Sequence, residues 1–392
     1  MRSPGPPVWR PWAPPGKGVI EVEGVGIRRV LLHEDAADSS LARTACDRLK
    51  KVPSRIVFED RAGGEGKGEP GRIDLDKETL RLVAFPGEML KPCPGTGEGY
   101  ICCGYQILNV GVNCPLDCSY CILQAYINQP SLRVFANLPR ALSGLADRID
   151  RDPSRFWRIG TGEFTDSLAL DPVVGWTDLL LPFMEGRRNA ILELKTKTVR
   201  IEGLLASRTR DRIVVSWSLN SPRIVSREEH RAPSLEKRLR AAARCQEEGF
   251  AVGFHFDPLV RHPGWKEGYE RTVELLDRWI APKKVIWISL GAMRFMPGLK
   301  PIIRRRHPGS EVLRGEFVPG TDGKLRYFKP MRTEMYAHLR ELLTAWHPDP
   351  GLYLCMERDD VWLDAMGWSP GTSKGLSDYL DERARTTFSI IG

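Results

Sequence analysis

The chain has 392 residues, of which 42% are hydrophobic and 28% charged, and its formal net charge is +8 at pH 7. This composition excludes a wholly disordered chain, a collagen-like chain and a small disulfide-rich protein, and the length allows two or three domains. No apolar run approaches the 18 residues that a membrane span needs. The first residues also lack the apolar stretch of a secretory signal. We therefore expect a cytoplasmic protein with no membrane contact.

The N-terminal part divides into two segments. Residues 1–17 contain six prolines and little apolar periodicity, which predicts a flexible arm. Residues 18–95 predict a small α/β domain with a glycine-rich loop at 62–71. Its expected strands are 27–32, 55–58 and 80–85, and its expected helix is 39–51.

Residues 100–296 show a repeated alternation of strands and helices. Short β-branched or apolar runs occur at 105–110, 156–159, 190–194, 213–219, 250–256 and 285–290. Helical patterns such as 235–248 and 268–279 lie between them. This alternation indicates parallel βαβ units, so we predict a partial (β/α)6 barrel. In such a barrel, functional residues gather at the carboxyl ends of the strands.

Residues 297–392 form a basic C-terminal extension. Between positions 299 and 332 there are nine Lys or Arg residues and three acidic ones. A helical stretch with three arginines precedes a predicted hairpin around 321–323, and a helix at 333–346 and a strand at 352–355 follow. A basic segment with interleaved aromatics can contact nucleic acid, although a charge run is also typical of a solvated face. The candidate nucleic-acid contacts are Arg304, Arg305, Arg306, Lys324, Arg326, Tyr327 and Lys329.

Six of the nine cysteines fall between positions 93 and 121. Without an export signal a disulfide framework is not expected, so the clustering indicates metal or thiol chemistry. Cys114, Cys118 and Cys121 have the spacing C-x3-C-x2-C in a loop after a predicted strand. Three such thiolates can ligate iron or zinc, and with iron–sulfur chemistry one coordination position stays open. A zinc site would need a further ligand from Cys93, Cys102 or Cys103.

The three cysteines are part of a wider resemblance. C-x3-C-x2-C after the first strand of a βα barrel is the signature of the radical S-adenosylmethionine (SAM) superfamily. Within it, the chain resembles the spore photoproduct lyase family over about residues 25–345. The stretches that carry this resemblance are 104–106, 118–124, 132–138, 218–221, 253–258, 261–265 and 293–295.

The resemblance implies two cofactors. Cys114, Cys118 and Cys121 would bind a 4Fe-4S cluster, SAM would chelate the fourth iron, and reductive cleavage of SAM would give a 5′-deoxyadenosyl radical. It also implies an electron donor such as flavodoxin or ferredoxin.

Several residues at the predicted strand ends are candidates for SAM contacts. Glycines at 160 and 162 allow a close backbone approach, and the carboxylate of Glu163 can accept from an ammonium group. Strand period places His255 and Asp257 on one face, either toward a substrate or on a polar outer surface. The full set that the resemblance implies for SAM is Tyr120, Gly160, Gly162, Glu163, Lys195, Ser218 and Asn220.

The resemblance implies a carbon–carbon lyase that repairs a DNA pyrimidine adduct, with DNA as partner. The family returns a hydrogen from a cysteine just after the second barrel strand, with a tyrosine following the third cluster cysteine. Here residues 160–166 contain no cysteine, and position 122 is isoleucine. Cys355 is our candidate for a relocated hydrogen donor, with Cys102 or Cys103 as further candidates.

Two other functions stay open at this point. One is a radical SAM enzyme that modifies a peptide, another nucleic acid or a metabolite. The other is a non-catalytic, zinc-stabilised nucleic-acid-binding protein. The oligomeric state is not specified by the sequence.

Overall fold

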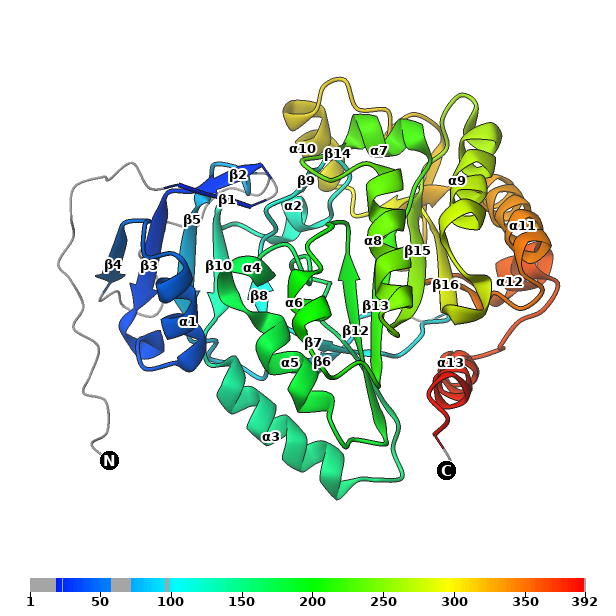
Figure 1. Cartoon of the computed structure of the whole chain (residues 1–392). Helices are drawn as coiled ribbons and strands as arrows, with labels where there is room; N and C mark the ends of the chain where they lie inside the picture. The colour runs from blue at the N-terminus through cyan, green and yellow to red at the C-terminus, as the bar shows by residue number, and fades with distance from the viewer. Residues whose placement is uncertain (1–18, 23, 58–71, 96–98, 391–392) are drawn as a thin grey trace.

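The computed structural model describes residues 19–22, 24–57, 72–95 and 99–390. The predicted proline-rich arm and the predicted glycine-rich loop at 62–71 lie outside these residues. A curved sheet forms the centre of the described chain, with a smaller sheet at one end and the C-terminal helices at the other (Figure 1).

The central sheet has eight strands within the described residues, in the order β20-β16-β15-β13-β12-β11-β7-β6. Seven strands are parallel and β6 is antiparallel to β7 at one edge. The six predicted barrel strands are all present, which confirms the partial barrel. Because both faces of a parallel sheet are covered, its strands are almost continuously apolar, as in β16, where all eight residues are buried. The strand bounds are β6 Leu90–Pro92, β7 Gln106–Leu108, β11 Trp157–Gly160, β12 Ala190–Thr196, β13 Ile213–Ser218, β15 Ala251–Leu259, β16 Val285–Ala292 and β20 Leu352–Leu354.

Amphipathic helices cover the outer face of this sheet (Figure 1). In α3, the buried side chains of Leu138, Leu142, Leu145 and Ile149 recur with helical spacing, so one stripe of the helix packs inward. Helix α8 contacts β13 and β15, and α5 contacts β12. The helices of this part are α2 Leu123–Tyr126, α3 Leu138–Arg151, α4 Asp171–Val174, α5 Trp176–Met184, α6 Glu202–Ala206, α7 Pro222–Glu228, α8 Leu235–Glu247 and α9 Trp265–Trp279.

The N-terminal unit is built on a five-stranded sheet with the order β4-β3-β5-β10-β8. Its strands β8 and β10 come from residues after 105, so the expected domain boundary at residue 95 does not coincide with a boundary between sheets. A short β1–β2 hairpin and helix α1 complete the unit. The bounds are β1 Ile20–Val22, β2 Val25–Ile27, β3 Arg29–His33, α1 Ser40–Arg48, β4 Ser54–Val57, β5 Asp76–Val83, β8 Gly111–Val112 and β10 Ser131–Phe135.

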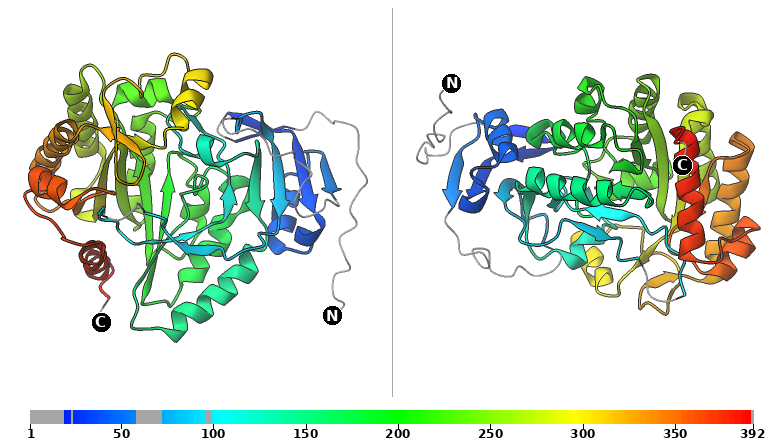
Figure 2. Two further views of the ribbon diagram at one scale, coloured as in Figure 1. Left: turned by 180° about the vertical axis from the view of Figure 1, so that it is seen from behind. Right: turned by 90° about the horizontal axis from the view of Figure 1, so that it is seen from below.

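The C-terminal extension contains the predicted hairpin, β18–β19, which pairs with β17 in a three-stranded sheet. Helix α11 begins at Lys329 rather than 333, because Pro330 fits the first turn of a helix. Figure 2 shows the last helix, α13, at the end of the molecule opposite the N-terminal sheet. The bounds are β17 Arg294–Phe295, α10 Leu299–Arg306, β18 Phe317–Pro319, β19 Leu325–Tyr327, α11 Lys329–Trp346, α12 Asp359–Met366 and α13 Ser373–Thr387.

The segment before β7 closes the gap between the two edges of the curved sheet. The backbone N–H of Ile101 donates to the carbonyl of Glu357, just after β20, at 2.8 Å. Helix α13 supports this seam, because Arg158 on β11 pairs with Asp381 at 2.6 Å. Residues 100–105 and the chain after β20 therefore belong to the barrel wall.

In the part of the chain that the structure describes, we find no helix with the length and apolar character needed to cross a membrane.

Candidate active site

The three-cysteine loop begins at a fixed backbone position. Asn113, which is buried and has φ of 71°, follows β8. Its side-chain amide donates to the carbonyls of Ile73 and Pro130, both at 2.9 Å, and its Oδ1 accepts from the N–H of Cys114 at 2.8 Å. Asparagine tolerates the left-handed conformation better than most residues, and these three bonds hold the turn. The loop continues through β9 (Asp117–Cys118), which pairs with β14 (Glu229–His230).

The thiols of Cys114, Cys118 and Cys121 are free and interact electrostatically with one another. Burial raises the pKa of Cys114 to about 12, and it raises the pKa values of the other two as well. The three thiols therefore keep their protons in the absence of a metal. Iron ligation replaces those protons, so the donor set fits an iron–sulfur cluster with three protein ligands.

A single metal ion is a poorer match to this loop. Across residues 19–22, 24–57, 72–95 and 99–390, no three His, Cys, Asp or Glu side chains are grouped so that they could hold one ion. A zinc ion draws four ligands to about 2.0–2.3 Å from one atom, whereas each cysteine of a cubane cluster binds a different iron. The structure thus gives no support to the zinc alternative.

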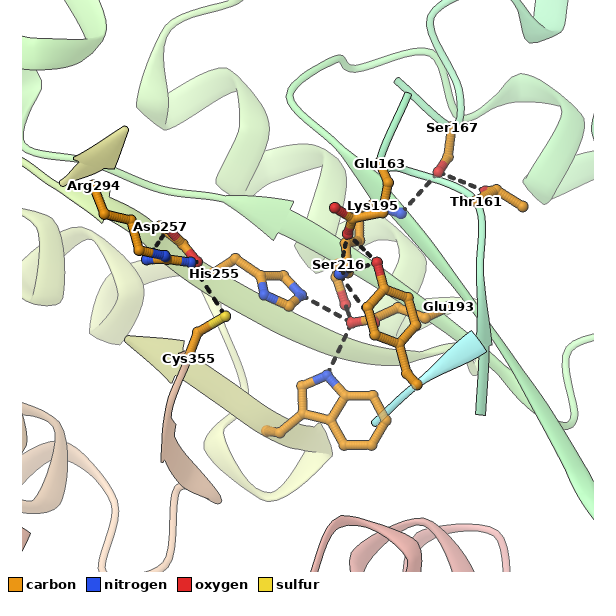
Figure 3. Close-up of polar contacts among 12 residues, drawn as sticks. Thr161, Glu163, Ser167, Glu193, Lys195, Ser216, His255, Asp257, Arg294 and Cys355 are labelled. Atoms are coloured by element: carbon orange, nitrogen blue, oxygen red, sulfur yellow. Dashed lines mark hydrogen bonds and ion pairs between the residues drawn. The ribbon is translucent and has the colours of Figure 1, made fainter. Parts of the chain in front are cut away.

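Glu163 and Lys195 meet at the carboxyl ends of β11 and β12 (Figure 3). The Nζ of Lys195 lies 3.0 Å from Oε1 of Glu163 and donates to the hydroxyl of Tyr105 at 2.9 Å. That hydroxyl in turn donates to Glu163. Burial works against ionisation of Glu163, but Lys195 and Tyr105 outweigh it and hold its pKa below the usual value. The pair is therefore a half-buried, ionised carboxylate beside an ammonium group.

The two glycines of this motif are required by protein packing. A Cβ at Gly160 would lie 2.6 Å from the ring of Tyr105, and one at Gly162 would lie 2.5 Å from the Cβ of Lys195. Both contacts are too close for any larger residue. Gly160 and Gly162 thus allow Tyr105 and Lys195 to reach Glu163.

The loop after Glu163 is fastened to the end of β12. The Oδ1 of Asp166 accepts from the N–H of Leu168 at 2.9 Å and from the hydroxyl of Thr196 at 2.8 Å. Its Oδ2 accepts from the N–H of Lys197 at 2.8 Å. These bonds keep the loop 163–169 in place without a cysteine in 160–166.

Glu193 is a central site residue that the sequence did not single out. Its Oε1 accepts from Ser216 at 2.6 Å, from Trp287 at 3.0 Å, and is bonded to His255 at 2.9 Å (Figure 3). Although burial opposes its ionisation, its partners hold the pKa of Glu193 well below the usual range. The sequence feature that could have identified Glu193 is a single glutamate within the otherwise apolar run 190–194.

His255 and Asp257 share the inner face of β15, as their spacing predicted, while Phe254 and Phe256 are buried. Asp257 pairs with Arg294 at 2.9 Å. The guanidinium of Arg294 also donates to the sulfur of Cys355 at 3.4 Å, directly after β20 (Figure 3). Burial raises the pKa of Cys355 well above its ordinary value, so this thiol carries a hydrogen at neutral pH.

A second group of thiols lies along the closing seam. The side chains of Cys93, Cys102 and Cys103 lie close enough to influence one another's ionisation. Cys102 and Cys103 also interact electrostatically with Cys355. The three cysteines that the sequence named as possible hydrogen donors thus interact electrostatically.

Other predicted SAM contacts are engaged within the protein. The amide of Asn220 donates to the carbonyl of Pro258 at 2.7 Å, and its oxygen accepts from Tyr269 at 2.7 Å. Tyr120 is buried and its hydroxyl donates to Glu229. Ser218 is half-buried at the end of β13. Glu163, Lys195 and the two glycines are thus grouped, and the polar groups of Asn220 and Tyr120 have hydrogen-bond partners within the protein.

The predicted nucleic-acid residues separate into exposed and internal ones. Arg304 and Arg305 are exposed on α10. Arg326 is 2% exposed and pairs with Asp322 at 2.5 Å. The other four are also engaged: Tyr327 is buried, Lys324 donates to Gly95, Lys329 pairs with Asp360 and Asp364, and Arg306 contacts the cysteine loop.

A family model described as "Spore photoproduct lyase" matches residues 103–347. The chain belongs to the spore photoproduct lyase family. This is a family of radical SAM enzymes, so its members work with a 4Fe-4S cluster and SAM. Cys355 and helices α12 and α13 lie beyond the matched residues.

Curated relatives and solved structures agree with this placement. The spore photoproduct lyase of Clostridium acetobutylicum is 22% identical over 290 residues, covering 73% of this chain and 84% of that protein. The enzyme of Bacillus subtilis is 24% identical over 203 residues, covering 51% of this chain and 59% of that protein. A solved double mutant of a spore photoproduct lyase, with bound AdoMet and dinucleoside spore photoproduct, superposes with a TM-score of 0.72. It is 21% identical and covers 83% of this chain and 97% of that one, which shows a common fold.

Proposed function

We propose that this chain is a radical SAM lyase that reverses a DNA pyrimidine adduct of the spore photoproduct type. One observation carries the proposal. The cysteine loop lies near the strand ends that hold Glu163 and Lys195, because the Nζ of Lys197, two residues after Lys195, is 5.8 Å from the centroid of the Tyr120 ring. The donor set for a cluster and a half-buried acid–base pair therefore share one end of the barrel.

Each group has a distinct task in this proposal. Cys114, Cys118 and Cys121 hold the cluster, which, with SAM bound, supplies the 5′-deoxyadenosyl radical. Glu163 accepts from the amino group of SAM, since a carboxylate has about four acceptor sites and its two internal bonds leave capacity. Lys195 donates to a carboxylate or ribose oxygen. Gly160 and Gly162 keep these side chains in place, and Ser218 offers a hydroxyl at the next strand end.

The substrate in this proposal is DNA. Arg304 and Arg305 are exposed at the same end of the molecule as the cysteine loop (Figure 1). Nearby, the buried carboxylate of Glu311 is bonded by three half-exposed or exposed arginines, Arg223, Arg227 and Arg314. Together these four side chains carry two net positive charges. Such a surface attracts the phosphate backbone. A DNA substrate places the enzyme in the cytoplasm, where flavodoxin or ferredoxin is the class of electron donor.

We assign the hydrogen donor to Cys355. Its S–H bond breaks, the hydrogen atom passes to the carbon radical of the product, and a thiyl radical is left on Cys355. Arg294 fixes the sulfur at the barrel mouth, and the raised pKa keeps the hydrogen on it. Cys102 and Cys103, on the adjoining seam, are the alternative donors.

The test is repair of a defined substrate. Anaerobically reconstituted protein is incubated with dithionite, SAM and a spore-photoproduct dinucleotide, and the products are analysed by mass spectrometry. Thymine dinucleotide together with 5′-deoxyadenosine is the expected result. An intact adduct in the presence of 5′-deoxyadenosine would overturn the substrate.

That second outcome would favour a different radical SAM substrate, such as a peptide, another nucleic acid or a metabolite. Two observations favour this alternative. Residues 160–166 contain no cysteine, and Arg326 and Tyr327 of the basic hairpin are buried. The exposed arginines of α10 weigh against it.

A further inference from the structure

The N-terminal unit reaches into the cysteine loop through one short segment, residues 73–77. Asn113, at the start of the loop, donates to the carbonyl of Ile73 at 2.9 Å. Asp74 pairs with Arg306 at 3.2 Å, and Arg306 also contacts the loop. Lys77, on β5, makes the deepest contact. The proposed function gives residues 73–77 no role.

Lys77 is 2% exposed, which is unusual for a lysine. Its Nζ donates to the carbonyl of Leu116 at 2.5 Å and lies 3.4 Å from Oδ1 of Asp117. Both partners lie between Cys114 and Cys118. A buried charge is costly unless it is paired and hydrogen-bonded, so this lysine is held by the loop and holds the loop in return.

Asp117 belongs to a network of two cations and two carboxylates. Its Oδ1 accepts from Arg306 at 2.8 Å and lies beside Lys77, while Arg306 also pairs with Asp74 at 3.2 Å. The two cations close to Oδ1 favour the ionised form of this carboxylate. Because Lys77 bonds the backbone between Cys114 and Cys118, its positive charge stands within the cysteine loop.

We propose that Lys77 is a positioning residue for the iron–sulfur cluster, which fixes the loop 114–118 and raises the reduction potential of the cluster. This rests on the assignment of the cluster to Cys114, Cys118 and Cys121. Reduction adds one negative charge to the cluster, and a nearby cation stabilises that state. The net charge and hydrogen bonds around an iron–sulfur cluster are known determinants of its potential.

In an electrostatic role, removing the charge of Lys77 and removing the charge of Asp117 shift the midpoint potential of the cluster in opposite directions. A purely structural role predicts no such opposition. Lys77→Met replaces the cation with an uncharged side chain of similar shape, and we expect a lower midpoint potential of the cluster. Asp117→Asn removes an anion with almost no change of volume, and we expect a higher one. Lys77→Arg keeps the charge and should stay close to the wild type. The control is Lys50→Met, an exposed lysine of the same unit.

The experiment reconstitutes each protein anaerobically, counts iron per chain and determines the midpoint potential by an EPR-monitored redox titration. Circular dichroism checks folding. Opposite shifts in Lys77→Met and Asp117→Asn support the inference; equal potentials in both, or shifts of the same sign, overturn it. If Lys77→Met does not retain iron, the positioning role is supported, and the potential of Asp117→Asn alone decides the electrostatic one. If the wild type binds no iron, the cluster assignment itself fails, which is a separate outcome.

Discussion

The carboxylate of Glu163 and the ammonium group of Lys195 lie 3.0 Å apart at the ends of two neighbouring strands, and the hydroxyl of Tyr105 bonds both. An acceptor for an ammonium group and a donor for a carboxylate are thereby placed side by side. The amino-acid part of SAM carries both of these groups. The pair therefore complements by charge the methionine end of SAM, which we propose that it binds.

Glu163→Gln should weaken SAM binding. A hydrogen bond to a charged group contributes about 1.5–3 kcal/mol, so we expect Kd to rise by about tenfold or more. Equilibrium binding of SAM to the reconstituted protein measures this. Glu185→Gln, at an exposed position after α5, is the matched control. An unchanged Kd in Glu163→Gln would remove this residue from the SAM site.

Cys355→Ala should separate SAM cleavage from completed repair. Because a thiol exchanges its hydrogen with solvent, wild-type repair in D2O should place one solvent deuterium in the product. In Cys355→Ala, 5′-deoxyadenosine should still form while the deuterated product is lost. Cys46→Ala, in the N-terminal helix α1, serves as control. Full repair with the same deuterium content in Cys355→Ala would move the donor role to Cys102 or Cys103.

The double variant Arg304→Ala, Arg305→Ala should weaken binding to DNA of any sequence. For each phosphate contact removed, the slope of log K against log salt should fall by about one. Fluorescence anisotropy with duplex DNA over a salt series measures both effects. Arg151→Ala, an exposed arginine on α3, should leave the slope unchanged. Equal slopes in all three proteins would show that α10 does not contact DNA.

The pattern of the sequence predicted the barrel well, because strand and helix periods are local properties. The six barrel strands and the hairpin around 321–323 all occur. The three cysteines also lie in one loop, because they are close together along the chain. Glu163 and Lys195 meet because each follows its own strand directly.

Local patterns cannot show which charged residues are buried. Within Arg304-Arg305-Arg306, only the third turns inward, because Asp74 and Asp117, far away in sequence, accept from it. The same holds for Lys77 and Glu193, whose partners come from other strands. The closing contact of Ile101 with Glu357 joins segments more than 250 residues apart and has no sequence signal. Long-range pairing decides these features.

Glu193→Gln should destabilise the fold in a pH-dependent way. Removing the charge from a buried, fully bonded carboxylate costs about 3 kcal/mol of unfolding free energy. Because the folded pKa of Glu193 is lowered, its contribution is present above the unfolded value of about 4.3 and is lost as the pH falls below it. Urea unfolding at pH 7 and at acidic pH should show a difference between the two proteins that shrinks with acid. A constant difference would mean that shape, and not charge, matters at this position.

The central claim is that Cys114, Cys118 and Cys121 hold a cluster that cleaves SAM. The most direct measurement compares the wild type with Cys118→Ala after anaerobic reconstitution, by counting iron and by quantifying 5′-deoxyadenosine formed from SAM with dithionite. We predict a brown wild-type protein with about four irons per chain that forms 5′-deoxyadenosine, and no 5′-deoxyadenosine from Cys118→Ala. A colourless wild type that contains zinc, or full SAM cleavage by Cys118→Ala, would contradict the account.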